Sequence, residues 1–250
     1  MIVRTQLGML RRQLLSCVFR RLIELRDIGP VVTFSFDDCP RTAITNGGAI
    51  VEQFKGRATF YVAMGLEGTR NRLGEQFHAA DLRGLSDRGH EVATHTFSHL
   101  SARRASLDVF LKDVQHGEDA LRECLGPSAS TNFAYPYGEA TVRAKMCLGP
   151  QLWSCRGTQG GLNGPFVDLN LLRANRLYGG TERSEAAKSL ILENEVRRSW
   201  LIFYSHDVAE TPSAFGCTPA LLEEVASFAS GRRARIATVA EVLVDLARMP

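Results

Sequence analysis

The pattern of apolar and polar positions predicts a chain that alternates between short buried strands and amphipathic helices. From residue 31 onward, compact apolar runs are separated by longer stretches in which apolar residues recur every three or four positions. The predicted strands are residues 31–36, 58–63, 91–93, 132–134, 152–155, 174–178, 200–204 and 234–237. The predicted helices are residues 45–55, 76–88, 106–124, 139–147, 184–198 and 218–230, and the capping-box sequence Thr238-Val239-Ala240-Glu241 opens a last one.

This alternation indicates a parallel sheet covered by helices, because buried strands separated by helices form β–α–β units. Seven or eight such units over some 220 residues favour a closed barrel over an open sheet. We therefore expect an α/β fold, a distorted (β/α) barrel of about seven parallel strands. The chain has no G-x-G-x-x-G sequence after its first strand and no P-loop, which argues against nucleotide binding.

The first 29 residues form a segment of their own in this pattern. Six apolar residues at steps of three and four predict an amphipathic helix over residues 4–26, stopped by Gly29-Pro30. They are Leu7, Leu10, Leu14, Val18, Leu22 and Leu25. The expected organisation is an N-terminal helix in residues 1–29 and one domain in residues 30–250. Two roles for the helix stay open, which are packing against the barrel and peripheral contact with an anionic membrane.

Charge and cysteine content narrow the class of protein. The formal net charge is +3, but residues 1–29 carry six arginines against Glu24 and Asp27, a net +4, so the rest of the chain sums to −1. A near-neutral body does not support a nucleic-acid-binding face. No apolar run is long enough for a membrane span or an export signal, and the six cysteines form no CxxC pair. We expect a cytoplasmic protein with reduced cysteines, whose contact with a membrane would be peripheral and through residues 4–26.

Residues that can bind a metal follow two of the predicted strands, where catalytic residues of parallel barrels gather. Asp37 and Asp38 follow the first strand, and two adjacent carboxylates beside a core are costly without a cation. His95 and His99 are four residues apart and can converge on one metal ion if the segment coils. The alternatives are an exposed turn for the aspartates and ordinary core or surface positions for the histidines.

Two further strand ends carry candidate chemistry. The turn Pro136-Tyr137-Gly138 can point a backbone N–H into a pocket, as an oxyanion donor must, although a tight turn needs no function. His206 lies just beyond the strand 200–204, where a lone histidine is more often structural than catalytic.

Together these segments resemble the polysaccharide deacetylases of the NodB-homology superfamily, carbohydrate esterase family 4, over residues 31–245. Four family motifs have counterparts in matching order and spacing. The segment Ser35–Pro40 corresponds to the family motif T-F-D-D-G-P, and His95–His99 corresponds to H-[ST]-x-x-H. The segment Ala134–Tyr137 corresponds to R-x-P-Y, and Phe203–His206 corresponds to L-x-x-H. The resemblance implies a barrel of the NodB type.

The resemblance also implies a metal site and a reaction. Asp38, His95 and His99 would hold a divalent metal, most often zinc, and Asp37 would act as the general base. The implied reaction is the hydrolysis of an N-acetyl or other small N-acyl group from an amino sugar. The implied substrate is an N-acetylated glycan or a lipid-linked sugar.

The remaining roles implied by the resemblance concern the leaving group and the acyl group. The Tyr137 backbone N–H would stabilise the oxyanion, and His206 would protonate the leaving amine. Pro136 and Phe203 would contact the substrate, with Phe203 in the place of the leucine that commonly lines the acyl pocket.

The chain departs from the family pattern at three points. Cys39 stands where the family usually has glycine, either as an inert side chain or as an oxidation-sensitive thiol beside the metal. Ala134 replaces the arginine that pairs with the catalytic aspartate, and no clear D-x-x-D-W motif follows. We expect Arg156, just past the strand 152–155, to supply the missing cation; the alternative is a surface arginine.

Two other functions stay open. One is a metal-independent amidase of the same fold that acts on a small cyclic amide, against which the intact Asp38, His95 and His99 set argues. The other is a degenerate member that only binds glycans, which the presence of Asp37 and His206 disfavours.

Overall fold

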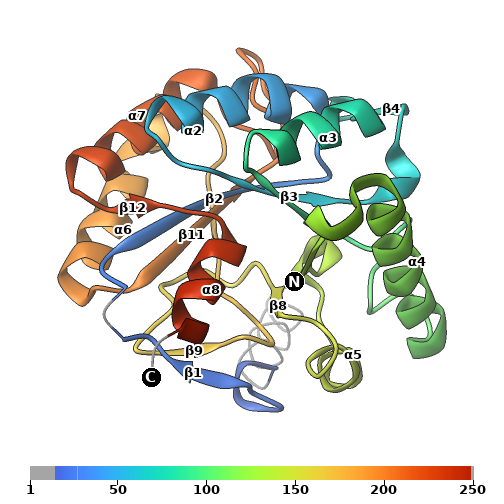
Figure 1. Cartoon of the computed structure of the whole chain (residues 1–250). Coiled ribbons are helices and arrows are strands. Elements are labelled where there is room, and N and C mark those ends of the chain that lie inside the picture. The colour runs from blue at the N-terminus through green and yellow to red at the C-terminus, as the bar shows by residue number, and fades with distance from the viewer. Residues whose placement is uncertain (1–14, 27, 249–250) are drawn as a thin grey trace, which may run out of the picture.

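The computed structural model describes residues 15–26 and 28–248, built around one curled parallel sheet (Figure 1). Its strands are ordered β10-β11-β2-β3-β6-β7-β8, and β12 pairs with β2 outside this path. The strands are β2 (Val31–Asp37), β3 (Thr59–Val62), β6 (Glu91–Thr94), β7 (Ser130–Ala134), β8 (Ser154–Arg156), β10 (Asn175–Arg176), β11 (Trp200–Ser205) and β12 (Arg235–Ile236). All neighbouring pairs are parallel and the sheet is curled (Figure 1), which confirms the predicted distorted barrel. Among the described strands β10 and β8, at the two ends of the path, do not pair with each other, so the expectation of a closed barrel is wrong.

Helices surround this sheet. They are α2 (Ala49–Gln53), α3 (Ala79–Asp87), α4 (Leu107–Leu125), α5 (Val142–Leu148), α6 (Ser184–Arg197), α7 (Pro219–Gly231) and α8 (Val239–Arg248), and a π-helical turn, Ala43–Gly48, leads into α2. Figure 1 shows α6, α7, α2, α3 and α4 following one another around the outside of the sheet. Among the described residues, no helix combines the length and the apolar composition needed to cross a membrane.

The sequence explains why these helices pack as they do. On α4 the buried residues recur at steps of three and four, which gives one apolar face toward the sheet. They are Phe110, Val114, Gly117 and Leu121. The start of α8 has the predicted capping box, because the Thr238 backbone N–H donates to Glu241 at 2.8 Å and the Glu241 N–H donates to the Thr238 hydroxyl at 3.0 Å.

Strand β2 directs its side chains alternately to two sides, and this alternation creates the site. All seven residues are buried. Phe34 and Phe36 join the large apolar cluster shared with the outer helices, whereas Ser35 and Asp37 point to the inner face. The Ser35 hydroxyl donates to the Phe203 carbonyl at 2.8 Å, which leaves Asp37 as the last inward residue of the strand.

The predicted helix over residues 4–26 is wrong in its C-terminal part. Residues 15–17 are helical, but β1 (Leu22–Glu24) pairs antiparallel with β9 (Phe166–Asp168). The leucines that suggested a helix also fit a strand, since Ile23 and Leu25 pack on the barrel while Leu22 is exposed. Residues 4–14 lie outside the described part of the chain.

Long-range contacts hold this N-terminal segment on the barrel and override its local helical pattern. The Arg21 backbone N–H donates to the Asp168 carboxylate at 3.0 Å, and its guanidinium donates to the carbonyls of Gly149, Leu152 and Trp153. Beneath it, the buried Lys145 ammonium donates to Asp168 at 2.7 Å and to the Leu15 carbonyl at 3.0 Å. The described part of the segment therefore packs on the barrel. The boundary expected at residue 29 stays a prediction.

Every predicted strand of the central sheet is present, with shifted ends. The strand expected over residues 152–155 spans Ser154–Arg156, so Arg156 lies inside the sheet rather than after it. A small hairpin of β4 (Arg70–Asn71) and β5 (Gly74–Glu75) was not predicted, because two-residue strands leave no periodic signal.

Candidate active site

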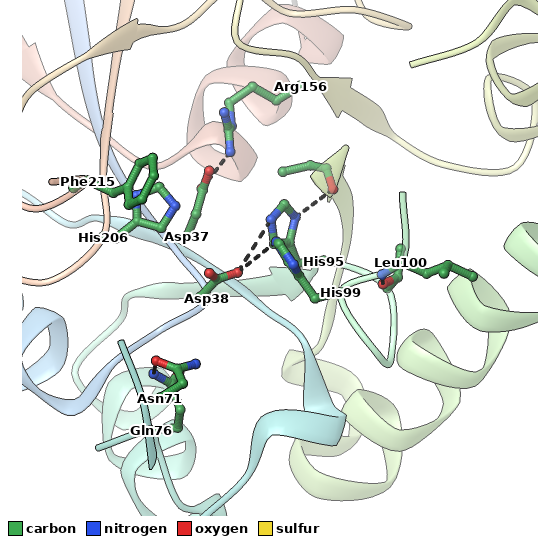
Figure 2. Close-up of polar contacts among 12 residues, drawn as sticks. Asp37, Asp38, Asn71, Gln76, His95, His99, Leu100, Arg156, His206 and Phe215 are labelled. Carbon is green, nitrogen blue, oxygen red and sulfur yellow. Dashed lines mark hydrogen bonds and ion pairs between the residues drawn. The ribbon is translucent and has the colours of Figure 1, made fainter. Parts of the chain in front are cut away.

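A cavity of about 310 Å³ opens at the carboxyl ends of the central strands. Six of the sequence-predicted site residues line it, namely Asp37, Asp38, His95, His99, Tyr137 and His206. Arg72, Gly138, Thr158, Arg176, Tyr178, Tyr204 and Phe215 complete the wall. Figure 2 shows the carboxylates and imidazoles of this group directed toward one another from separate elements.

Asp37 is held by Arg156 (Figure 2). The fully buried Arg156 guanidinium, at the end of β8, donates to Asp37 Oδ1 at 2.5 Å, and Asp37 is itself buried at the end of β2. The guanidinium carbon of Arg156 lies 4.9 Å from the centre of the Tyr61 ring and 5.2 Å from the centre of the Tyr204 ring. The faces of two aromatic rings therefore hold the cation in place. Arg156 thus occupies the place expected for the missing family arginine, and its catalytic role stays a prediction.

Electrostatics keeps Asp37 ionised. Burial acts to raise the pKa of the Asp37 carboxyl, but the charges of Arg156, His95 and His206 and the Arg156 hydrogen bond outweigh it. The net effect is a pKa below the ordinary value of an aspartate. A carboxylate fixed in its ionised form beside a cavity can accept a proton or a hydrogen bond from whatever enters.

Asp38, His95 and His99 bring their ligand atoms together, all within 4.8 Å of one another. Asp38 Oδ1 lies 3.1 Å from His99 Nε2 and 3.8 Å from His95 Nε2, and although buried it accepts no hydrogen bond. The other nitrogen of His95, Nδ1, donates to the Ala134 carbonyl at 2.7 Å, which leaves Nε2 unprotonated and directed at Asp38.

The ionisation of these three groups suits a cation. Burial raises the pKa of Asp38 to about 6, an effect that the charges of His206 and Arg72 oppose and that of Asp37 reinforces. Burial lowers the pKa of His95 to about 3 and also lowers that of His99. At neutral pH the set is therefore one carboxylate and two neutral imidazoles. Such an open set of one oxygen and two nitrogens is typical of a catalytic zinc site.

The loops that carry these groups adopt left-handed backbone at five non-glycine residues. Asp38, Cys39, Thr96, His99 and Tyr137 have φ between 57° and 64°. Each such residue costs about 1–2 kcal/mol relative to right-handed backbone, and such strain is often concentrated at functional sites. Glycine would adopt this conformation freely at Cys39. The Cys39 thiol is fully buried and burial raises its pKa, which favours an inert side chain over an oxidation-sensitive one.

His206 and Tyr137 line the same cavity as Asp38, His95 and His99. The His206 Nδ1 donates to the Phe215 carbonyl at 3.1 Å, and Figure 2 shows the imidazole beside Asp37. The Tyr137 ring is half-exposed and packs edge-on against His99, with ring centres 4.6 Å apart. The oxyanion role of its backbone N–H stays a prediction.

The two residues expected to bind substrate do not line the cavity. Phe203 points to the outer side of the sheet, where its ring stacks on Phe34 at 5.8 Å, and its neighbour Tyr204 faces the cavity instead. Successive strand residues face opposite sides, so the motif correspondence placed the side chain one residue too early. Pro136 is buried and is likewise absent from the lining.

Several residues of the cavity wall were not predicted from the sequence. Arg72 belongs to the unpredicted hairpin, and Phe215 lies in a loop, so neither carried a signal. Arg176 and Tyr178 lie within or beside β10, and their inward direction becomes visible only from the pairing of β10 with β11.

Part of this chain matches a known family and a curated protein. Residues 26–148 match the polysaccharide deacetylase family. The chain is 30% identical over 126 residues to peptidoglycan-N-acetylmuramic acid deacetylase PdaC of Bacillus subtilis, a match that covers 49% of this chain and 25% of that protein. The chain thus spans about a quarter of the length of this curated relative.

Solved structures extend the likeness to the whole barrel. The chitin deacetylase of the fungal pathogen Colletotrichum lindemuthianum superposes with a TM-score of 0.60 at 20% identity, covering 88% of this chain and 89% of that one. A mutant of Bacillus subtilis PdaC superposes with a TM-score of 0.53 at 19% identity, covering 90% of this chain and 94% of that one. At these identities the likeness shows a shared fold.

Proposed function

Because this chain belongs to the polysaccharide deacetylase family, we propose that it is a metal-dependent hydrolase that removes an N-acetyl or other small N-acyl group from an amino sugar of a glycan. One observation carries the proposal. An ionised carboxylate, Asp37, and a three-residue metal-binding set face the same small cavity.

The side chains present fit a divalent cation. Asp38, His95 and His99 would hold it, since the buried Asp38 Oδ1 has no hydrogen-bond donor and the His95 Nε2 lone pair is directed at the same point. Two imidazole nitrogens and one carboxylate oxygen favour Zn²⁺ over Mg²⁺ or Ca²⁺, which prefer oxygen ligands. When bound, such a cation lowers the pKa of water and polarises a carbonyl oxygen.

Three residues of this chain have separate roles in the proposed reaction. Asp37, kept ionised by Arg156, accepts a proton from the water that attacks the acyl carbon. The Tyr137 backbone N–H, at the cavity wall, donates to the carbonyl oxygen as negative charge develops on it. His206, oriented by the Phe215 carbonyl, donates a proton to the nitrogen as the C–N bond breaks. The products are acetate and the free amino sugar.

Acetate release from N-acetylglucosamine oligomers tests this proposal. Purified protein treated with a chelator should lose activity and regain it with Zn²⁺. Asp37→Asn should lower kcat by about 10³-fold, because the amide cannot accept the proton. Asp119→Asn, on the exposed side of α4, is the matched control. Release of acetate that is independent of metal, or equal in Asp37→Asn and the wild type, would show that the proposal is wrong.

We further propose that the enzyme acts in a reducing compartment, the cytoplasm, next to a membrane that presents a lipid-linked sugar. All six cysteines are free, and Phe19, Leu22 and Phe166 are exposed apolar side chains on and beside the β1–β9 ribbon. Flotation with anionic vesicles tests the membrane contact. Binding that Leu22→Glu and Phe166→Glu leave unchanged would contradict it.

A further inference from the structure

Two arginines line the catalytic cavity without holding the fold together. Arg72 lies in the hairpin between β4 and β5, and Arg176 ends β10. Within the described residues neither guanidinium forms an ion pair or a hydrogen bond. By contrast, Arg41 near the same hairpin is paired with Glu75 and Asp81. The charges of Arg72 and Arg176 are therefore available to a ligand.

Arg72 is fixed close to the catalytic group. Its guanidinium carbon lies 4.8 Å from the centre of the Phe215 ring, and that ring lies 5.8 Å from the His206 ring, centre to centre. A guanidinium stacked on a ring keeps its N–H donors available at its edges, where a carboxylate or phosphate can accept them in pairs. Arg72 is thus separated from the proposed proton donor by one aromatic side chain.

The charge balance of the cavity also favours an acidic ligand. The two carboxylates that line it, Asp37 and Asp38, face three guanidiniums, those of Arg72, Arg176 and the Asp37 partner Arg156. Arg156 already neutralises Asp37, and Asp38 belongs to the metal-binding set. A divalent cation would leave the cavity strongly positive, so a neutral sugar would leave the charges of Arg72 and Arg176 uncompensated.

We propose that the substrate is an N-acyl amino sugar that carries an acidic group, a carboxylate or a phosphate, and that Arg72 together with Arg176 binds this group. The inference rests on the proposed deacetylase function and adds the substrate class to it. Arg72 and Arg176 lie on different elements, so the acid bound between them would fix the orientation of the sugar relative to Asp37 and His206.

Three related sugars test the inference by acetate release. They are N-acetylglucosamine, its lactyl ether N-acetylmuramic acid, and N-acetylglucosamine 1-phosphate, each supplied to the zinc-loaded protein at low ionic strength. The wild type should show kcat/KM about tenfold higher for at least one acidic sugar than for the neutral one, and added salt should reduce the difference. The preferred acid shows whether the group is a carboxylate or a phosphate.

Variants assign the preference to residues. Arg72→Gln and Arg176→Gln should each lower the acidic-to-neutral ratio of kcat/KM by about 5- to 10-fold, and the double variant should remove the preference. Arg70→Gln is the matched control, because Arg70 is exposed on the same hairpin and does not line the cavity. It should keep the wild-type ratio.

The outcomes separate this inference from the proposed function. Equal kcat/KM for neutral and acidic sugars, or a preference that survives in the double variant, overturns the inference and leaves the deacetylase function standing. If no sugar releases acetate, calorimetric titration of the same three sugars decides. Tighter binding of an acidic sugar that the double variant loses upholds the anion site and rejects the deacetylase function, whereas equal binding overturns both.

Discussion

Two buried ion pairs at different places on the barrel differ in their surroundings. Arg156 and Asp37 meet at the candidate active-site cavity, and Lys145 and Asp168 meet beneath the N-terminal segment. Both cations are fully buried and both carboxylates are nearly so. They differ in how completely their hydrogen-bonding capacity is used.

The Lys145–Asp168 pair is closed, in the sense that other protein groups use its remaining hydrogen-bonding capacity. Asp168 also accepts hydrogen bonds from the backbone N–H groups of Arg21 and Asn170, and Lys145 also donates to Leu15. The Asp37 carboxylate, among the described residues, accepts from Arg156 alone, and the Arg156 Nε has no acceptor. A closed pair fixes the fold, whereas an open pair keeps an ionised oxygen for a ligand.

The largest expected effect comes from removing the cation of the Arg156–Asp37 pair. Arg156→Gln should lower kcat for acetate release about 100-fold, because Asp37 would no longer be held in place and ionised. With the Arg156 charge gone, burial would raise the pKa of Asp37, so the acid limb of the pH–rate profile should move to higher pH. An unchanged limb would mean that Arg156 only supports the fold.

Breaking the Lys145–Asp168 pair should lower the stability of the protein and leave kcat unchanged. Lys145→Met leaves Asp168 buried without its cation and should reduce the free energy of unfolding by about 3 kcal/mol, measured by urea denaturation. At a temperature where the variant is folded, kcat should match the wild type. A loss of kcat comparable with that of Arg156→Gln would remove the distinction between the two pairs.

Asp38 extends the comparison to a third buried carboxylate, whose Oδ1 has no hydrogen-bond partner among the described residues. Its pKa is about 6, so the group takes up a proton below that pH and would have to release it to bind a cation. The Zn²⁺ affinity should therefore fall about tenfold for each pH unit below 6, because one proton competes with the metal. Competition titrations between pH 5 and pH 7 measure this slope, and Asp38→Asn should flatten it.

An exposed ion pair gives the smallest effect and serves as the baseline. Glu193 and Arg197 lie one turn apart on α6, 3.0 Å from each other and in contact with solvent. Glu193→Gln should change the free energy of unfolding by about 0.3 kcal/mol, close to the error of denaturation experiments. A loss as large as that of Lys145→Met would show that burial is not what distinguishes the pairs.

The parts of this molecule that follow from local pattern could be predicted from the sequence. The strands of the central sheet have continuous apolar runs, and Asp37, Asp38, His95 and His99 follow from their place at strand ends. The motif correspondence also led to the prediction that Arg156 supplies a cation for Asp37, and the two side chains form an ion pair.

The remaining features depend on contacts between distant residues. Leu22 and Leu25 fit a helix by spacing, but Arg21 and Asp168 draw this segment into a ribbon with β9. The inward direction of Tyr204 rather than Phe203 follows from the register of β11 against β2. Arg72 lies in a hairpin of two-residue strands, which leaves no pattern to detect.

The ribbon formed by β1 and β9 has a consequence for the order in which the chain assembles. Arg21 and Asp168 are 147 residues apart in sequence, so β1 cannot dock until most of the barrel has been synthesised. Ile23 and Leu25 would stay uncovered on the emerging chain during that interval, since the cluster they pack on includes residues beyond position 200. The first described segment of the chain is thus expected to be among the last to fold. Strand β1 would pair with β9 only after the barrel residues that it contacts have folded.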